Sequence, residues 1–123
     1  TYGKKGEYDK AIGYYQKALD VFFKALGAEH PEIAKTYNNI GLAYDNKGEY
    51  DKAIGYYEKA LAIYLKTVGE EHLDVASNYH NLGLAYSKKG DKPKALEQLL
   101  ELAAVRRRVR EAGSDLPMLR APA

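Results

Sequence analysis

The chain has 123 residues, of which 46% are hydrophobic, and its 19 Lys or Arg against 17 Asp or Glu give a formal net charge of +2. It contains no cysteine, which excludes disulfides and thiolate metal sites. No apolar run approaches the roughly 18 residues of a membrane span and no charged-then-apolar leader opens the sequence, so we expect a cytoplasmic protein without a span or signal peptide.

The sequence is built from copies of one unit. Residues 1–42 match residues 43–84 at 24 of 42 positions, and a weaker third copy follows from Ala85. Because a repeat of this length cannot bury its apolar face alone, we expect a stack of units rather than a globule. The chain opens in mid-repeat, and we therefore expect it to be a fragment of a longer protein.

The first predicted helix covers residues 7–26, with Gly6 marking the turn that precedes it. Its apolar residues recur at steps of three and four, as on one stripe of an amphipathic helix. Gly13 and its copy Gly55 interrupt this pattern, each at a cost of about 1 kcal/mol relative to Ala. The sequence offers no reason for keeping both glycines.

The second predicted helix covers residues 31–46 and opens at Pro31, whose missing N–H is harmless in a first turn. Gly41 on this helix predicts a close approach of two backbones, which any Cβ would prevent. Further helices are expected over 49–68, 74–88 and 91–112. Gly113 and Ser114 predict a helix stop, followed by an irregular tail over 113–123.

The spacing Tyr37-x2-Ile40-Gly41-x2-Tyr44, followed by Ala53-x3-Tyr57, resembles the signature of the tetratricopeptide repeat. The unit is longer than the common repeat of about 34 residues. Its length and the Leu-Gly-x-x-His-Pro segment at residues 26–31 resemble the repeats of kinesin light chains. The resemblance implies an all-α, right-handed superhelical solenoid of antiparallel helix pairs that acts as a non-catalytic protein-interaction scaffold. We divide the chain into a partial repeat over 1–30, repeats over 31–72 and 73–112, and the tail.

Catalytic signals are absent from the sequence. Its three histidines lack the spacing of a zinc-binding helix, and no phosphate-binding glycine loop or nucleophile motif occurs. His30 and His72 occupy the same repeat position, and we expect them to fix the entry of a helix. We therefore predict no enzymatic activity, cofactor or metal.

Function is expected on the first helix of each repeat, which lines the concave side of such a stack. The side chains not used for packing define the predicted groove: Lys35, Asn38, Asn39, Leu42, Asp45, Asn46, Ser77, His80, Asn81, Leu84, Ser87 and Lys88. The resemblance implies that Asn39 and Asn81 pair with the backbone of a bound peptide, because an amide offers both a donor and an acceptor. The alternative is that they hold the turn between repeats.

Leucine at positions 42 and 84 argues against the clamp with which some tetratricopeptide domains hold a C-terminal carboxylate. The tyrosine pairs 14–15 and 56–57 are interpreted mainly as core, since one ring of each falls on the apolar stripe. A bound peptide is expected to be extended or a short helix with an apolar anchor.

A second interpretation is self-association through the repeat ends, which would give open fibres, a swapped dimer or a monomer capped by its own tail. The tail contributes Leu116, Met118 and Leu119, and the predicted association surface is Tyr8, Ile12, Tyr15, Leu19, Leu96, Leu99, Leu100 and Leu102. A third, weaker interpretation is nucleic-acid binding by Arg106, Arg107, Arg108 and Arg110, although four cations also suit a helix C-terminus.

Overall fold

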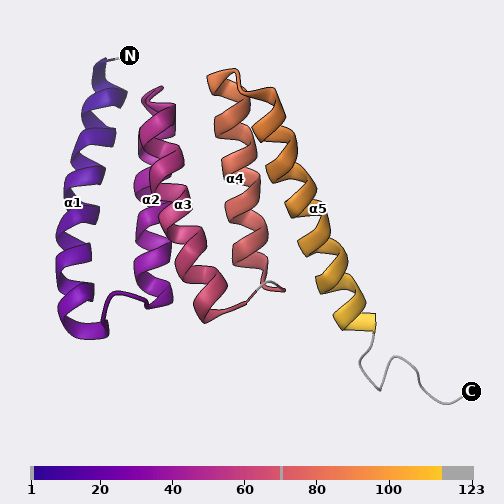
Figure 1. Cartoon of the computed structure of the whole chain (residues 1–123). Coiled ribbons are helices and arrows are strands. Elements are labelled where there is room, and N and C mark those ends of the chain that lie inside the picture. Colours follow the sequence, from indigo (N-terminus) through magenta and orange to yellow (C-terminus); the bar gives the residue numbers. More distant parts are fainter. Residues whose placement is uncertain (1, 70, 115–123) are drawn as a thin grey trace, which may run out of the picture.

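The computed structural model describes residues 2–69 and 71–114, which form five helices standing side by side (Figure 1). They are α1 (Tyr2–Leu26), α2 (Pro31–Asn46), α3 (Tyr50–Thr67), α4 (Leu73–Lys89) and α5 (Lys92–Ser114). Within a repeat, α2 packs on α3 and α4 packs on α5; between repeats, α1 packs on α2 and α3 on α4. The predicted all-α stack of helix pairs is confirmed. Within the described ranges, no helix is long and apolar enough to cross a membrane.

The connections between helices follow one rule. Gly27, Gly48, Gly69 and Gly90 all have φ between +84° and +97°, and they are evenly spaced along the sequence at half the repeat. This left-handed conformation is costly for residues with a Cβ, so glycine ends each half-repeat. The starts of α2, α3, α4 and α5 are therefore nearly evenly spaced along the sequence, at residues 31, 50, 73 and 92.

Two predicted helix ends are wrong. α1 begins at Tyr2 and runs through Gly6, where the sequence predicted a turn. A segment this short does not form a helix of its own, because nucleation is unfavourable, and it extends α1 instead. At the other end α5 continues to Ser114, so Gly113 does not stop it. Residues 115–123, with the predicted tail contacts of the chain, lie outside the described residues.

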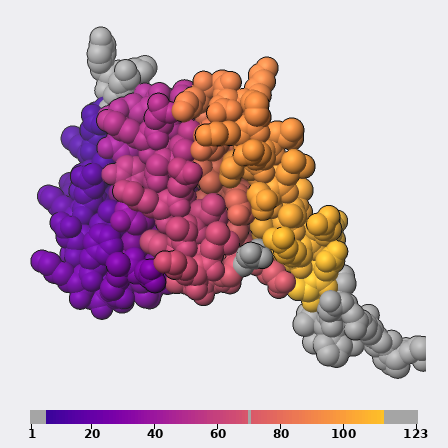
Figure 2. All heavy atoms as spheres, in the orientation of Figure 1, coloured from indigo at the N-terminus to yellow at the C-terminus, as the bar shows by residue number. Residues whose placement is uncertain are grey.

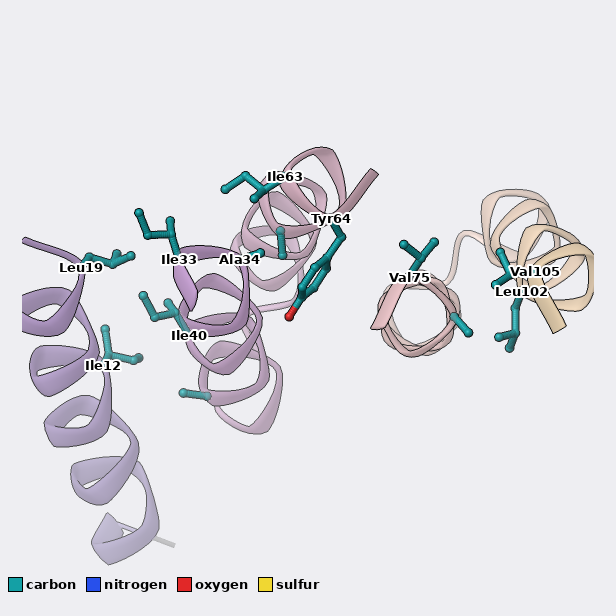
Figure 3. Packing of buried hydrophobic residues seen from close by; sticks show 13 residues of the cluster. Ile12, Leu19, Ile33, Ala34, Ile40, Ile63, Tyr64, Val75, Leu102 and Val105 are labelled. Carbon is teal, nitrogen blue, oxygen red and sulfur yellow. The ribbon is translucent and has the colours of Figure 1, made fainter. Parts of the chain in front are cut away.

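The core runs through the stack as a chain of helix-to-helix contacts (Figure 3). Ile12 and Leu19 of α1 point towards Ile33 and Ile40 of α2. Further along, Tyr64 of α3 lies in the same cluster as Val75 of α4, together with Leu102 and Val105 of α5. A second cluster joins α3, α4 and α5: Ala53, Ile54, Tyr57, Leu82, Ala85, Tyr86 and Ala95. Each helix thus depends on its neighbours for burial, as expected for a repeat stack.

The predicted close approach at Gly41 is confirmed. A Cβ at this position would lie 2.6 Å from Cε1 of Tyr57 and 3.2 Å from the carbonyl oxygen of Ala53. Tyr57 is fully buried, so its ring fills the space that the missing side chain leaves. By contrast, an added Cβ at Gly13 or Gly55 would meet nothing within 4 Å, and nothing in the structure explains glycine there.

Candidate peptide-binding groove

The predicted groove residues lie on α2 and α4, and most of them are at least partly exposed. Lys35, Leu42, Asn46, Ser77, His80, Leu84, Ser87 and Lys88 are exposed, whereas Asn38, Asn39 and Asn81 are half-buried. The two leucines occupy the same repeat position and are 39% and 42% exposed, respectively. They are the large apolar side chains of this surface.

Asp45 is a correction to the predicted groove, because only 8% of it is exposed. Its Oδ1 accepts a hydrogen bond from Nζ of Lys88 at 2.9 Å, and its Oδ2 accepts one from the Tyr57 hydroxyl at 3.3 Å. Burial raises the pKa of Tyr57, and the nearby Asp45 charge raises it further. These three residues join α2, α3 and α4, so Asp45 holds the stack together instead of facing a ligand.

A second polar link between α2 and α4 is formed by amides. Oδ1 of Asn38 accepts hydrogen bonds from Nδ2 of Asn78 at 3.3 Å and from Nδ2 of Asn81 at 3.2 Å. One amide hydrogen of Asn81 is therefore committed to the repeat junction. This bond joins two first helices and reaches no turn, and it leaves the other hydrogen and the carbonyl oxygen of Asn81 for a ligand.

Sequence reasoning missed Asn78, which is fully buried and whose Oδ1 has no hydrogen-bond partner among the described residues. Its equivalent in the preceding repeat is Thr36, also buried, whose hydroxyl donates to the Glu32 carbonyl at 2.8 Å. A polar residue that recurs at one position of successive repeats, inside an apolar stripe, is the signal that could have identified this junction position.

His80 of α4 is the equivalent of Asn38 of α2. Asn38 contacts α4, the first helix of the following repeat. Ser77, His80 and Asn81 line a hollow together with Leu102 and Arg106 of α5. Ser77, His80 and Asn81 thus also border α5, and Asn81 in addition bonds back to Asn38 of α2.

The helix starts confirm the interpretation of two histidines. Nδ1 of His30 accepts a hydrogen bond from the Glu32 N–H at 3.1 Å, and Nδ1 of His72 accepts one from the Asp74 N–H at 3.0 Å. Each imidazole caps the first turn of a first helix, satisfying a donor that the helix leaves unpaired. Within residues 2–69 and 71–114, no three metal-ligating side chains gather into a candidate ion site.

Ion pairs also recur with the repeat. Lys47 pairs with Asp9, and Lys89, at the same position one repeat later, pairs with Asp51 at 2.7 Å. Hydrogen bonds from these lysines to the carboxylates raise the pKa of both lysines. The position of the next carboxylate in the series is occupied by Pro93.

The predicted association surface is partly wrong. Ile12, Leu19 and Leu102 are buried at 6%, 8% and 5% exposure, because they face neighbouring helices of the same chain. Tyr8 and Tyr15 are half-buried. The large apolar side chains that α1 exposes are instead Tyr14, Val21 and Leu26, at 70%, 62% and 43%.

The register of α1 explains this difference. Tyr14 and Val21 are equivalent to Tyr56 and Ile63, and Tyr56 packs on the first helix of its own repeat. On α5 the prediction agrees with the exposure of Leu96, Leu99 and Leu100, which are 58%, 41% and 61% exposed.

The fold and the groove define a helical-repeat scaffold of antiparallel pairs, and the comparisons with known proteins give its family. The family model of the tetratricopeptide repeat matches residues 1–66 and 46–108, and the chain belongs to this family. Tetratricopeptide repeats generally mediate protein–protein interaction. No curated protein matches the sequence significantly.

Among solved structures, the chain is similar to BtubC (BKLC) from P. vanneervenii, with 30% identity and a TM-score of 0.77 over 83% of this chain and 40% of that one. It is also similar to the nearly identical TPR-like repeats of a putative kinesin light chain from Podosopora anserina, with 25% identity and a TM-score of 0.73 over 98% and 56%. The chain therefore spans about half the length of these proteins or less, and its repeats are of the kinesin-light-chain-like type.

Proposed function

We propose that this chain is a non-catalytic, cytoplasmic interaction module that binds a peptide segment of a partner along α2 and α4. The observation that supports this most is the repetition of a partly exposed leucine, Leu42 and Leu84, at one position of successive first helices. Burying these two side chains under a ligand would be favourable.

Polar side chains flank the two leucines and suit a peptide backbone. Asn39 and Asn81 recur beside them, and Lys35, Ser77 and Asn46 are exposed on the same helices. An apolar anchor between amide groups fits a peptide whose side chains enter beside the leucines while its backbone pairs with the asparagines. The Asn38 and Asp45 contacts stiffen the junction beneath, which keeps the two leucines at a fixed separation.

The test begins with a peptide selected against the whole chain from a random displayed library, because a selected peptide supplies a defined ligand. The variant Leu42→Ala/Leu84→Ala should weaken its binding by roughly ten- to a hundredfold, since each truncation removes an apolar contact of about 1 kcal/mol or more. Asn39→Ala/Asn81→Ala should weaken it by about 0.5 to 1.5 kcal/mol per hydrogen bond lost, with helicity unchanged.

Val21→Ala is the matched control, because it truncates an exposed apolar residue on α1. Peptides that bind the leucine variant and the native chain equally well would place the binding site elsewhere. If the asparagine variant loses stability but not affinity, the turn-holding role of Asn39 and Asn81 is the correct one.

Self-association is a second candidate, supported by the exposure of Leu96 and Leu99 on α5. Their equivalents in the preceding repeat, Ile54 and Tyr57, are buried in a cluster with residues of α4. The face of α3 that packs on α4 is therefore buried, whereas the equivalent face of α5 is exposed. Sedimentation at about 10 and about 200 micromolar tests it: association that Leu99→Glu removes supports the candidate, and a monomer at both concentrations rejects it.

A further inference from the structure

Two junctions of the stack, formed by α1–α2–α3 and by α3–α4–α5, can be compared position by position. In the first, the ring of Tyr56 lies 5.9 Å from that of Tyr37 and stacks at 5.6 Å on that of Tyr44. Nζ of Lys59 lies 5.6 Å from the Tyr37 centroid and 5.0 Å from the Tyr56 centroid. A ring and a cation, three residues apart on α3, thus pack on the tyrosines of α2 in this junction.

In the second junction the same two positions carry Gln98 and Glu101, and the space between the helices is open. We call it the outer hollow. It is lined by Glu58 and Leu61 of α3, Tyr79 and Leu82 of α4, and Glu97, Gln98, Leu100 and Glu101 of α5. Figure 2 shows α3 in magenta and α5 in orange on the same face of the molecule. Tyr79, the equivalent of Tyr37, is half-buried there, and glutamine at position 98 stands where Tyr56 packs on Tyr37.

The charge of the two junctions differs. The outer hollow is lined by three carboxylates, those of Glu58, Glu97 and Glu101. At the equivalent positions the first junction has one carboxylate, Glu58, and one cation, Lys59, so its formal charge is zero. Of the described residues that line the outer hollow, none is basic. A cavity with charge of one sign and apolar walls favours an opposite charge strongly.

Leu100 adds an apolar wall that the stack does not require. It is 61% exposed, and the equivalent positions in the two preceding copies carry Gln16 and Glu58. A helix position that is polar in two copies and leucine in the third is therefore not explained by packing between repeats.

We propose that the outer hollow is a docking site for a basic helical segment of another protein, one that presents an aromatic side chain and, three residues later, a Lys or Arg. This segment would supply from outside the ring and the cation that Tyr56 and Lys59 supply within the chain. Its ring would pack on Leu61 and Leu100, and its cation would lie between Glu58, Glu97 and Glu101. Carboxylates of one sign beside apolar walls attract such a cation strongly.

The probe is a fluorescein-labelled, stapled helical peptide of alanine and lysine that carries one Tyr-x-x-Lys pair, measured by fluorescence anisotropy against the 123-residue chain. Two control peptides replace the tyrosine by alanine, or all lysines by glutamate. Native chain should bind the probe saturably, bind the alanine peptide at least about fivefold more weakly, and not bind the glutamate peptide.

Three protein variants locate the site. Gln98→Tyr/Glu101→Lys recreates the first junction and should reduce binding at least about tenfold, because the chain then fills its own hollow. Glu97→Gln/Glu101→Gln keeps the space and removes charge, so binding should weaken and lose most of its salt dependence. Leu42→Ala/Leu84→Ala alters the groove on α2 and α4 and should leave binding of this probe unchanged.

The outer hollow and the groove can therefore fail separately. The docking site is rejected if no saturable binding occurs, if the refilled variant binds like the native chain while circular dichroism shows it folded, or if the alanine peptide binds as well as the tyrosine peptide. The glutamine variant, which changes no side-chain volume appreciably, decides the matter if the refilled variant does not fold.

Discussion

Replacement of four glycines by alanine separates two effects that act in opposite directions on a helix. In a helix interior, Gly→Ala gains about 1 kcal/mol from reduced conformational freedom of the unfolded chain. At Gly41 this gain competes with a new methyl group 2.6 Å from the Tyr57 ring and 3.2 Å from the Ala53 carbonyl oxygen. The same replacement at Gly13 or Gly55 meets open space.

The size of the clash follows from what surrounds the ring. Tyr57 has no exposed surface, and its hydroxyl donates a hydrogen bond to Asp45. The ring therefore cannot rotate away from Gly41 without breaking that hydrogen bond. Overpacking of this kind costs roughly 2 to 3 kcal/mol, at the upper part of the usual range. Gly41→Ala should therefore lower the free energy of unfolding by about 1 to 2 kcal/mol, net of the helix gain. Gly13→Ala and Gly55→Ala should each raise it by about 1 kcal/mol.

Gly83 provides an intermediate case. An added Cβ there would meet Cδ2 of Leu99 at 3.0 Å, but Leu99 is 41% exposed and can rotate. Gly83→Ala should change stability by less than about 0.5 kcal/mol, since gain and strain nearly cancel. Urea unfolding followed by circular dichroism in the far ultraviolet measures all four variants. If Gly41→Ala stabilises the chain as much as Gly55→Ala does, the close approach of α2 and α3 is wrong.

Three further predictions concern polar groups. Lys88→Ala should lower the free energy of unfolding by about 1 to 2 kcal/mol, because it removes the cation paired with the buried carboxylate of Asp45. Lys89→Ala should leave the free energy of unfolding nearly unchanged, because its partner Asp51 is exposed. Urea titration compares the two variants. His30→Ala and His72→Ala should each cost about 1 kcal/mol of cap energy, and Asn at either position should restore most of it in the same assay. Burial raises the pKa of Tyr64 to about 12, so this tyrosine ionises in the unfolded chain first, from about pH 10. Tyr64 should therefore not affect thermal stability below about pH 10, and stability should fall between about pH 10 and 12. The fall should be less steep in Tyr64→Phe.

The sequence predicted those features that recur in both copies. The start of α2 at Pro31, the histidine caps and the tight contact at Gly41 all recur, or nearly recur, at the equivalent positions of the next repeat, and all are local or involve one helix pair. Periodicity and helix-start chemistry are sufficient to place such features.

Features that occur once could not be predicted in this way. Asp45 is buried and paired with Lys88, whose equivalent in the preceding repeat is Asn46, so comparing the copies gives no signal. Sequence reasoning predicts the wrong exposed face for α1, because the second helix of a repeat carries apolar residues on two faces, one towards each neighbouring first helix. Ile12 and Leu19 lie on the buried face of α1, whereas Tyr14 and Val21 lie on its exposed face.

The four left-handed glycines also determine how an array of this kind can change its length. Excising residues 28–69 would leave α1 followed by α4, a second helix followed by a first helix, with one glycine and one capping histidine between them, as in the intact chain. Excising only residues 28–48 would instead place α1 next to α3, two second helices in succession, and remove the surface that each of them needs. Loss of a whole helix pair therefore keeps first and second helices alternating along the chain, whereas loss of a single helix in the middle of the array breaks that alternation.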